Sequence, residues 1–205
     1  MLAESQLRRI LNRLPPRTIH GPYSRCVAYR HLVPRPPDAL PARGPQPLWG
    51  MGSRDSGGRF TPKGSFETVY LAEDPVTAFA EVWLFLQHPS APPFTVRTPP
   101  LVHVAVDAVL LSALDVTDAS TQDLLGTTRQ ELTGDWWPIQ TEGLEAPTQT
   151  LGRVCYESDR FDAIRYYSSK NPPNGVCIAV LPERLRDQAY LEVYDPYGQL
   201  AQRLP

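Results

Sequence analysis

Gly57-Gly58-Arg59-Phe60 stands before the segment Val69-Tyr70-Leu71-Ala72, which leads through Asp74-Pro75 into Ala78-Phe79-Ala80-Glu81-Val82. The β-branched and aromatic residues of the middle segment predict a short buried strand. Asp74 is a good N-cap residue and Pro75 suits the first helical position, so a helix is expected to begin there. The stretch therefore predicts a strand that turns directly into a helix.

Glu81 is the one charged residue in the helix predicted over Ala78–Leu86. Nearly every face of this segment is apolar, so we expect the carboxylate to be buried. A buried carboxylate needs a cationic or hydrogen-bonding partner, a raised pKa, or a ligand. Arg59 is a candidate partner, because the two glycines before it allow close approach of a ligand. Arg59, Tyr70 and Glu81, equally spaced in the chain, are predicted to surround a cleft for an anionic and aromatic ligand.

Each candidate also has a structural interpretation that the residue types alone leave open. Arg59 suits phosphate or carboxylate recognition through its planar fork of donors, but it also suits a turn with a surface salt bridge. Tyr70 lies in a predicted buried strand, where a tyrosine is more often a core residue. In Arg165-Tyr166-Tyr167-Ser168-Ser169-Lys170, a serine hydroxyl either binds a polar ligand or caps its own turn.

The composition favours a single domain without a metal site. The chain has 205 residues, 41% of them apolar, which suffices for one good core and is rather short for two. Its three cysteines, Cys26, Cys155 and Cys177, are far apart without C-x-x-C spacing, and its four histidines are scattered. We interpret the cysteines as buried thiols in a reducing compartment and expect no metal.

Charge and hydropathy argue against two classes of partner. With a net charge of −2, the chain lacks the basic surface expected of a duplex nucleic-acid binder. It contains no apolar run long enough to span a bilayer, and its N-terminus lacks the basic and apolar regions of a signal peptide. The chain is therefore expected to be cytoplasmic, with no membrane contact and no direct binding of nucleic acid.

The predicted elements favour an α+β fold. Helices are expected from Leu7 to Leu14, where Pro15-Pro16 stops the pattern, and over Thr148–Tyr156. An irregular loop is expected over Val33–Gly52, and short helices and loops over Thr121–Pro147. Besides Val69–Ala72, strands are predicted at Arg25–Leu32, Leu101–Leu111, Asp162–Tyr167, Val176–Leu181 and Tyr190–Tyr194. Because strands outnumber long helices without alternating regularly with them, we expect a curved, mostly antiparallel sheet.

Several short motifs, taken in order and with their spacing, carry a resemblance to a known family. They are Tyr29-Arg30, Gly57-Gly58-Arg59-Phe60, Val69-Tyr70-Leu71-Ala72, Thr77-Ala78 to Glu81-Val82, Leu114-Asp115-Val116-Thr117, Gln149-Thr150-Leu151-Gly152 and Ile164-Arg165-Tyr166-Tyr167-Ser168. From about Tyr29 to about Leu185 the chain resembles the RES-domain toxins of bacterial RES/Xre type II toxin–antitoxin systems.

This resemblance implies a fold similar to the ADP-ribosyltransferase toxins, with a split, mostly antiparallel β-sheet core and flanking helices. It implies an NAD-binding catalytic domain over residues 21–205, preceded by an N-terminal helical extension over residues 1–20. The implied activity is cleavage of the nicotinamide–ribose bond of NAD by a glycohydrolase or phosphorylase. NAD is then a substrate, and neither a cofactor nor a metal is required.

The resemblance also assigns site residues one by one. Glu81, Arg59 and Ser168 are implied to be catalytic, and Arg30 and Tyr70 join them in binding NAD. Glu81 suits the stabilisation of positive charge that develops on the ribose when an N-glycosidic bond breaks. Arg59 and Arg30 are expected to hold the pyrophosphate or ribose, and Tyr70 to flank the nicotinamide ring. Ser168 is expected to hydrogen-bond the ribose or the nicotinamide amide.

Two other functions stay open on the sequence alone. One is an ADP-ribosyltransferase that modifies a specific protein, since the acceptor, whether water, phosphate or protein, is chosen by the rim of the cleft. The other is a non-catalytic RES-like module that binds a nucleotide or a partner protein. As partners, the resemblance implies an Xre-type helix-turn-helix antitoxin that covers the cleft, and it is compatible with a homodimer.

Overall fold

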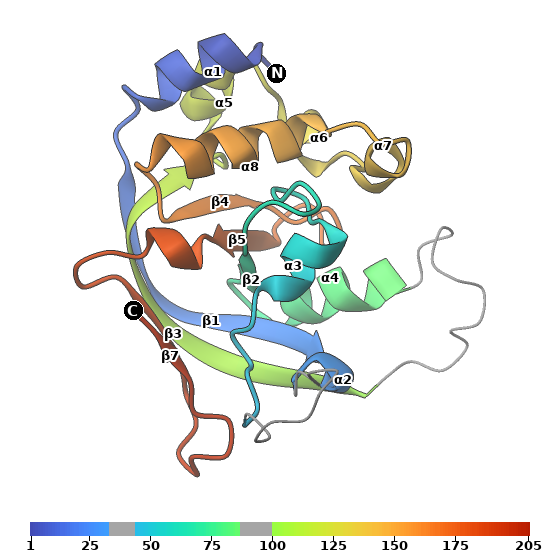
Figure 1. Cartoon of the computed structure of the whole chain (residues 1–205), viewed down its shortest axis with the longest axis vertical. Coiled ribbons are helices and arrows are strands. Elements are labelled where there is room, and N and C mark those ends of the chain that lie inside the picture. The colour runs from blue at the N-terminus through green and yellow to red at the C-terminus, as the bar shows by residue number, and fades with distance from the viewer. Residues whose placement is uncertain (33–43, 87–99) are drawn as a thin grey trace.

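The computed structural model describes residues 1–32, 44–86 and 100–205 as a mixed α+β structure (Figure 1). Its helices are α1 (Glu4–Leu11), α2 (Tyr29–Leu32), α3 (Met51–Ser56), α4 (Pro75–Leu86), α5 (Ala119–Leu125), α6 (Arg129–Thr133), α7 (Trp137–Thr141), α8 (Pro147–Ser158) and the 3-10 helix η1 (Pro182–Arg184). Its strands are β1 (Arg17–Ala28), β2 (Val69–Ala72), β3 (Leu101–Asp115), β4 (Ala163–Tyr167), β5 (Val176–Val180), β6 (Tyr190–Val193) and β7 (Arg203–Leu204).

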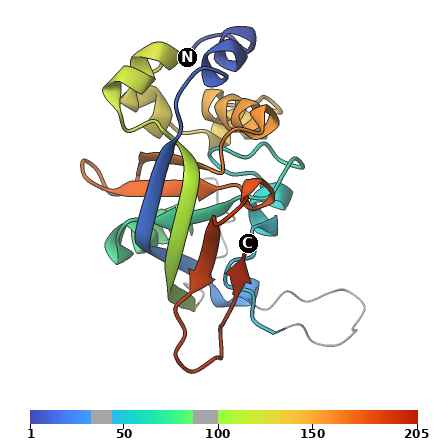
Figure 2. The same cartoon turned by 90° about the vertical axis from the view of Figure 1, so that its left-hand side faces the viewer.

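The strands form one sheet that closes on itself. Their order is β1-β2-β5-β4-β3-β6-β7, and an additional pairing between β1 and β3 joins the two sides into a barrel. Strand β3 runs parallel to β4, whereas the other strand pairs described are antiparallel. The hairpin of β6 and β7 extends from β3 (Figure 2). The α+β class and the mostly antiparallel pairing are confirmed. Where a split sheet was expected, the long ladder between β1 and β3 closes the sheet.

Side chains of the strands alternate between two buried clusters, because successive residues of a strand point to opposite faces. Ile178 belongs to one cluster together with Val106, whereas its neighbour Cys177 belongs to the other. This second cluster also contains Leu7 of α1 and Leu151 of α8, so helices cover that face of the sheet (Figure 1). The cleft described below lies beside this second cluster.

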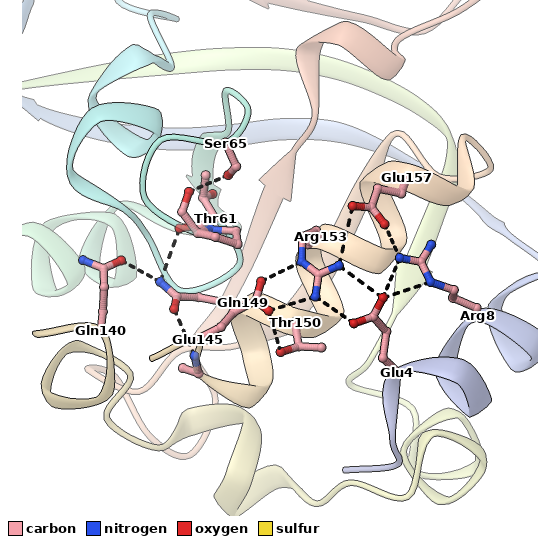
Figure 3. A network of polar contacts seen from close by, with 12 residues as sticks. Glu4, Arg8, Thr61, Ser65, Gln140, Glu145, Gln149, Thr150, Arg153 and Glu157 are labelled. Atoms are coloured by element: carbon pink, nitrogen blue, oxygen red, sulfur yellow. Dashed lines mark hydrogen bonds and ion pairs between the residues drawn. The ribbon is translucent and has the colours of Figure 1, made fainter. Parts of the chain in front are cut away.

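The amphipathic helix predicted near the N-terminus is α1, and it packs on α8. Leu7 and Leu11 are fully buried on its inner side. Glu4 forms an ion pair with Arg153 of α8 at 3.0 Å (Figure 3). Strand β1 begins at Arg17, ahead of the domain boundary expected at residue 20, and the division into an extension and a domain stays a prediction.

The segment predicted as one strand over Arg25–Leu32 divides at Ala28, which is a correction to the sequence-based assignment. Ala28 pairs with Leu101, the first residue of β3, and among the described residues the ladder ends there. The Tyr29 N–H donates instead to the Pro100 carbonyl at 2.8 Å, and the chain turns into α2. Arg30 therefore lies on a short helix outside the sheet.

Several other local predictions agree with the structure where it describes them. Strand β2 has the predicted bounds, and Asp74 caps α4 by accepting the Thr77 N–H at 2.8 Å. Short helices α5, α6 and α7 occupy the polar segment before α8. Part of the irregular loop expected over Val33–Gly52, residues 33–43, lies outside the described residues. Of the remainder, residues 51 and 52 begin α3, which corrects the end of that loop.

Candidate active site

A cavity of about 370 Å³ opens beside β1, β2 and α4. Arg59, Tyr70 and Glu81, the three equally spaced residues of the opening stretch, all line it. A second cavity of about 160 Å³ adjoins it, and Arg59 and Glu81 belong to both linings. The loop, strand and helix that carry the three residues are consecutive in the chain, which brings their side chains to one place.

Glu81 is partly buried on α4 and accepts a hydrogen bond from the Ser168 hydroxyl at 2.6 Å. The apolar composition of its helix does not by itself bury Glu81, because Val76 and Phe79 of α4 are exposed and Glu81 itself is only partly buried. Helix α4 packs on the sheet through contacts with β1, β2 and β5. The Glu81 carboxylate therefore faces the cavity, and the hydrogen bond from Ser168 holds it there.

Ser168 lies directly behind Glu81 and is only 1% exposed. Its oxygen accepts the N–H groups of Lys170 at 3.1 Å and Asn171 at 3.0 Å, and its single hydrogen is donated to Glu81. The Asn171 amide in turn donates to Thr77 of α4 at 2.8 Å. Ser168 thus caps its own turn, and this turn supports the hydroxyl that orients the Glu81 carboxylate, whereas its binding of a ligand stays a prediction. It lines neither cavity, so it acts through Glu81.

Arg59 is 8% exposed and is held by neutral acceptors. One terminal nitrogen donates to the carbonyls of Leu132 and Gly134 at 2.9 and 2.7 Å, and the other to the Ser169 hydroxyl at 2.9 Å. Within residues 1–32, 44–86 and 100–205, no carboxylate pairs with it. A guanidinium has five N–H donors, and these contacts use three of them. The remaining donors and the uncompensated charge suit an anionic ligand.

Tyr70 supports the glycine pair that precedes Arg59. A Cβ atom on Gly58 would lie 2.6 Å from the Tyr70 hydroxyl, so only glycine fits over the ring. The hydroxyl accepts the Phe60 N–H at 3.0 Å and hydrogen-bonds Thr61 at 3.0 Å. Burial raises the pKa of Tyr70 to about 12, so the phenol stays neutral at physiological pH and offers an uncharged wall to the cavity.

Helix α8 holds the same loop from behind (Figure 3). The Gln149 side-chain amide, which is buried, donates to the Gly58 carbonyl at 3.1 Å and to Gln140 at 2.8 Å. A Cβ atom on Gly152 would lie 1.8 Å from the Phe60 carbonyl oxygen, which explains the close packing of this helix against the loop. These contacts fix the backbone from which Arg59 projects.

Arg25 is a cationic residue of the cavity that the sequence analysis missed. Its guanidinium donates to the carbonyls of Pro47, Tyr70 and Trp49 at 2.7, 2.9 and 3.0 Å. No carboxylate among the described residues pairs with it. Burial lowers its pKa to about 10, so it remains charged near neutral pH. An arginine beside the apolar run Cys26-Val27-Ala28 was the available signal.

Arg30 is not brought together with the other predicted residues. It is exposed on α2, donates to the His31 ring at 3.1 Å and is absent from the lining of both cavities. His31 does line the larger cavity, and burial followed by the nearby Arg30 charge lowers the pKa of its imidazole. The assignment of Arg30 to NAD binding stays a prediction.

The arrangement defines what the site can do chemically. Two guanidinium groups that pair with no carboxylate of the described residues face a common cavity with the Glu81 carboxylate, a combination that can bind an anion and stabilise positive charge beside it. Burial raises the pKa of the neighbouring Cys177 thiol, which stays protonated. Among the described residues, no group of three His, Cys, Asp or Glu side chains is placed to hold a metal. No helix in the same part of the chain is long and apolar enough to cross a membrane.

Comparison with known proteins identifies the family. The fold is similar to that of a chain in the crystal structure of the M. tuberculosis MbcT-MbcA toxin–antitoxin complex, with a TM-score of 0.69 and 19% sequence identity. The match covers 94% of this chain and 92% of that chain, and at this identity it shows a shared fold. No curated protein matches the sequence. Residues 32–202 match the model of the RES domain. Since that match spans most of the chain, this protein belongs to the RES domain family.

Proposed function

We propose that this chain is an NAD-degrading toxin enzyme that cleaves the nicotinamide–ribose bond as a glycohydrolase or phosphorylase. The observation that carries the proposal is the Glu81 carboxylate, which is oriented by Ser168 and lines one cavity with two guanidinium groups that have no carboxylate partner in the described part of the chain. NAD has an anionic pyrophosphate and a cationic glycosyl linkage, which match these two kinds of charge. The ADP-ribosyltransferase-like fold and the catalytic unit over residues 21–205 belong to the same proposal.

The chemistry assigns a role to each of these side chains. Breaking the bond sends its electron pair to the nicotinamide nitrogen, so the leaving group departs neutral and positive charge develops on the ribose. Glu81 stabilises that charge electrostatically in a partly buried position. Arg25 and Arg59 hold the pyrophosphate, and Ser168 keeps the carboxylate in place. Tyr70, neutral at physiological pH, forms part of the cavity wall.

An antitoxin partner is part of this proposal. The fold is shared with a chain of a toxin–antitoxin complex, and RES domain membership supports the same interpretation. We expect an Xre-type helix-turn-helix protein that covers the cleft and neutralises the enzyme in the cytoplasm. A neighbouring gene for such a protein is the simplest supporting observation.

The test compares the wild-type chain with Glu81→Ala and with Glu142→Ala, an exposed carboxylate outside both cavity linings. After induction in cells, NAD should fall with the wild type and with Glu142→Ala, but not with Glu81→Ala. Purified protein incubated with NAD, with and without phosphate, should release nicotinamide, and the phosphate dependence separates phosphorolysis from hydrolysis. A folded wild-type protein that leaves NAD intact while growth stops would move the assignment to an ADP-ribosyltransferase.

A further inference from the structure

Two side-chain hydrogen bonds of the described residues join helix α4 to the turn between β4 and β5. One runs from Ser168 to Glu81 and is part of the proposed function. The other runs from the Asn171 side-chain amide to the Thr77 hydroxyl. We propose that Asn171 and Thr77 form a clasp that sets the direction of the Glu81 carboxylate, and that Asn171 is a positioning residue of the enzyme. This inference rests on the proposed cleavage of NAD, because it assigns a further residue to that reaction.

The two hydrogen bonds lie one helical turn apart on the same face of α4. Thr77 and Glu81 are four residues apart, a spacing that makes side chains neighbours along a helix. On the turn, the Asn171 N–H donates to the Ser168 oxygen at 3.0 Å, so the two partners are also neighbours. A helix held at one point can still rotate about its axis, whereas a second point fixes that rotation. The clasp therefore determines where Glu81 points.

The backbone of the turn keeps Asn171 in a fixed place. The Asn171 carbonyl accepts the Gly175 N–H at 2.8 Å, and the Ser168 N–H donates to the Gly175 carbonyl at 2.8 Å. A Cβ atom on Gly175 would lie 2.7 Å from the Asn171 carbonyl oxygen and 3.0 Å from the Cβ of Ser168, so only glycine closes the turn this tightly. The two residues that reach α4 therefore belong to one compact unit.

The direction of the hydrogen bond requires a donor at position 171. Thr77 is fully buried, and its hydroxyl donates its single hydrogen to the Asp74 carboxylate at 2.5 Å. This hydrogen bond lowers the pKa of Asp74, so the carboxyl is charged near neutral pH. The Thr77 oxygen is left as an acceptor and receives the Asn171 N–H at 2.8 Å. Asn171→Asp would keep the size of the side chain but lose this donor, and it would bring a second negative charge towards Asp74.

The kinetic test compares Asn171→Asp and Asn171→Ala with Asn174→Ala, which changes the same residue type at an exposed position of the same turn. Without the clasp α4 can rotate, and a misplacement of about 1 Å in a catalytic group can lower the rate about 10²-fold. The kcat for NAD cleavage should therefore fall about tenfold to a hundredfold in both Asn171 variants. The KM should stay within about threefold, because Arg25 and Arg59 lie outside α4 and this turn. Asn174→Ala should stay within about twofold of wild type.

A double-mutant cycle identifies the hydrogen bond as the cause. Thr77→Val keeps the shape of the side chain and removes the hydroxyl, so its kcat should fall at least as far as in Asn171→Ala. The double variant should be no slower than Thr77→Val, because both substitutions remove the same contact. Thr77→Ser keeps the hydroxyl and should recover most of the activity. Losses of kcat that multiply in the double variant would show that the two residues act separately and would overturn the clasp.

A second measurement needs no turnover and so separates this inference from the proposed function. Amide hydrogen exchange of the full chain, followed by mass spectrometry, should be faster in α4 of Asn171→Asp than in wild type, with exchange in α8 unchanged. A wild-type chain that leaves NAD intact would contradict the proposed function, while faster exchange in α4 would still support the clasp. Unchanged exchange in α4, an unchanged kcat, or a KM that rises as much as kcat falls in Asn171→Asp would overturn it.

Discussion

Two arginines that each follow a glycine have opposite surroundings. Arg153, in Gly152-Arg153 of α8, forms ion pairs with Glu4, Glu145 and Glu157 at 3.0, 2.8 and 3.5 Å (Figure 3). Hydrogen bonds to Glu145 and Glu4 raise the pKa of Arg153 above its usual value. Arg59, in Gly58-Arg59, donates only to backbone carbonyls and a hydroxyl in the contacts described above.

The difference separates a structural charge from one available to a ligand. In the helical layer of α1 and α8, Arg8 and Arg153 both pair with nearby carboxylates, so Arg153 joins two helices and needs no further partner. At the cavity, neutral oxygen atoms fix the geometry of Arg59 without cancelling its charge. A positive charge held in this way remains available to attract an anion, and its geometry is set before the ligand arrives.

The largest effect on NAD turnover is expected when each of these two arginines is replaced by lysine in a separate variant. Arg59→Lys keeps the charge but loses the planar fork, so NAD turnover should fall by about 10²–10³-fold, as when one preorganised donor is removed from an active site. Arg153→Lys should leave turnover within about twofold and lower the free energy of unfolding by about 0.5–1 kcal/mol. Steady-state kinetics and denaturant titration measure the two effects. Comparable losses of turnover in both variants would break the comparison.

A smaller effect on NAD turnover is expected from Arg25 and Arg30, which lie on either side of Ala28, the last residue of β1. Arg25→Gln removes a charge from the cavity, so the KM for NAD should rise about tenfold to a hundredfold, the loss expected for a hydrogen bond to a charged group. Arg30→Gln changes an exposed residue outside the lining, and its KM should stay within about threefold. Steady-state kinetics measure the KM for NAD of both variants, and circular dichroism confirms that each is folded. A larger effect at Arg30 would restore the assignment made from the sequence.

Local signals were sufficient for the centre of the site. Val69–Ala72 has strand-forming residues, and Asp74-Pro75 has the chemistry of a helix start, so β2 and α4 follow from their own sequence. Arg59, Tyr70 and Glu81 lie on three consecutive elements, and their meeting at one cavity needs no information from distant parts of the chain.

Distant contacts decided what the sequence analysis missed. The end of β1 is set by where β3 begins, which moved Arg30 out of the sheet and left Arg25 at the cavity. Closure of the barrel likewise depends on the ladder between β1 and β3. The shielding of Glu81 depends on Ser168, which approaches from β4, and not on the apolar composition of its own helix. Such contacts leave no periodic pattern within a short window of sequence.

The smallest effect is expected from the outer network that contrasts with the cavity. A hydrogen bond from Arg153 and a second from Arg8 lower the pKa of Glu4 from 4.5 to about 2 in the folded chain. A carboxylate whose pKa is depressed by folding stabilises the protein fully above its unfolded pKa, and that contribution is lost as pH falls between about 4.5 and about 2. Glu4→Gln should therefore flatten the dependence of stability on pH in this window.

The same substitution should slightly lower stability at neutral pH in dilute buffer, and the difference from wild type should shrink as added salt screens the exposed charges. Thermal unfolding across pH and ionic strength measures both trends, and NAD turnover serves as the control, because Glu4 lies outside both cavity linings. An unchanged pH profile in Glu4→Gln would show that the ion pairs of Glu4 do not hold α1 on α8. Helix α1 would then be held there mainly by its apolar side, in which Leu7 and Leu11 are fully buried.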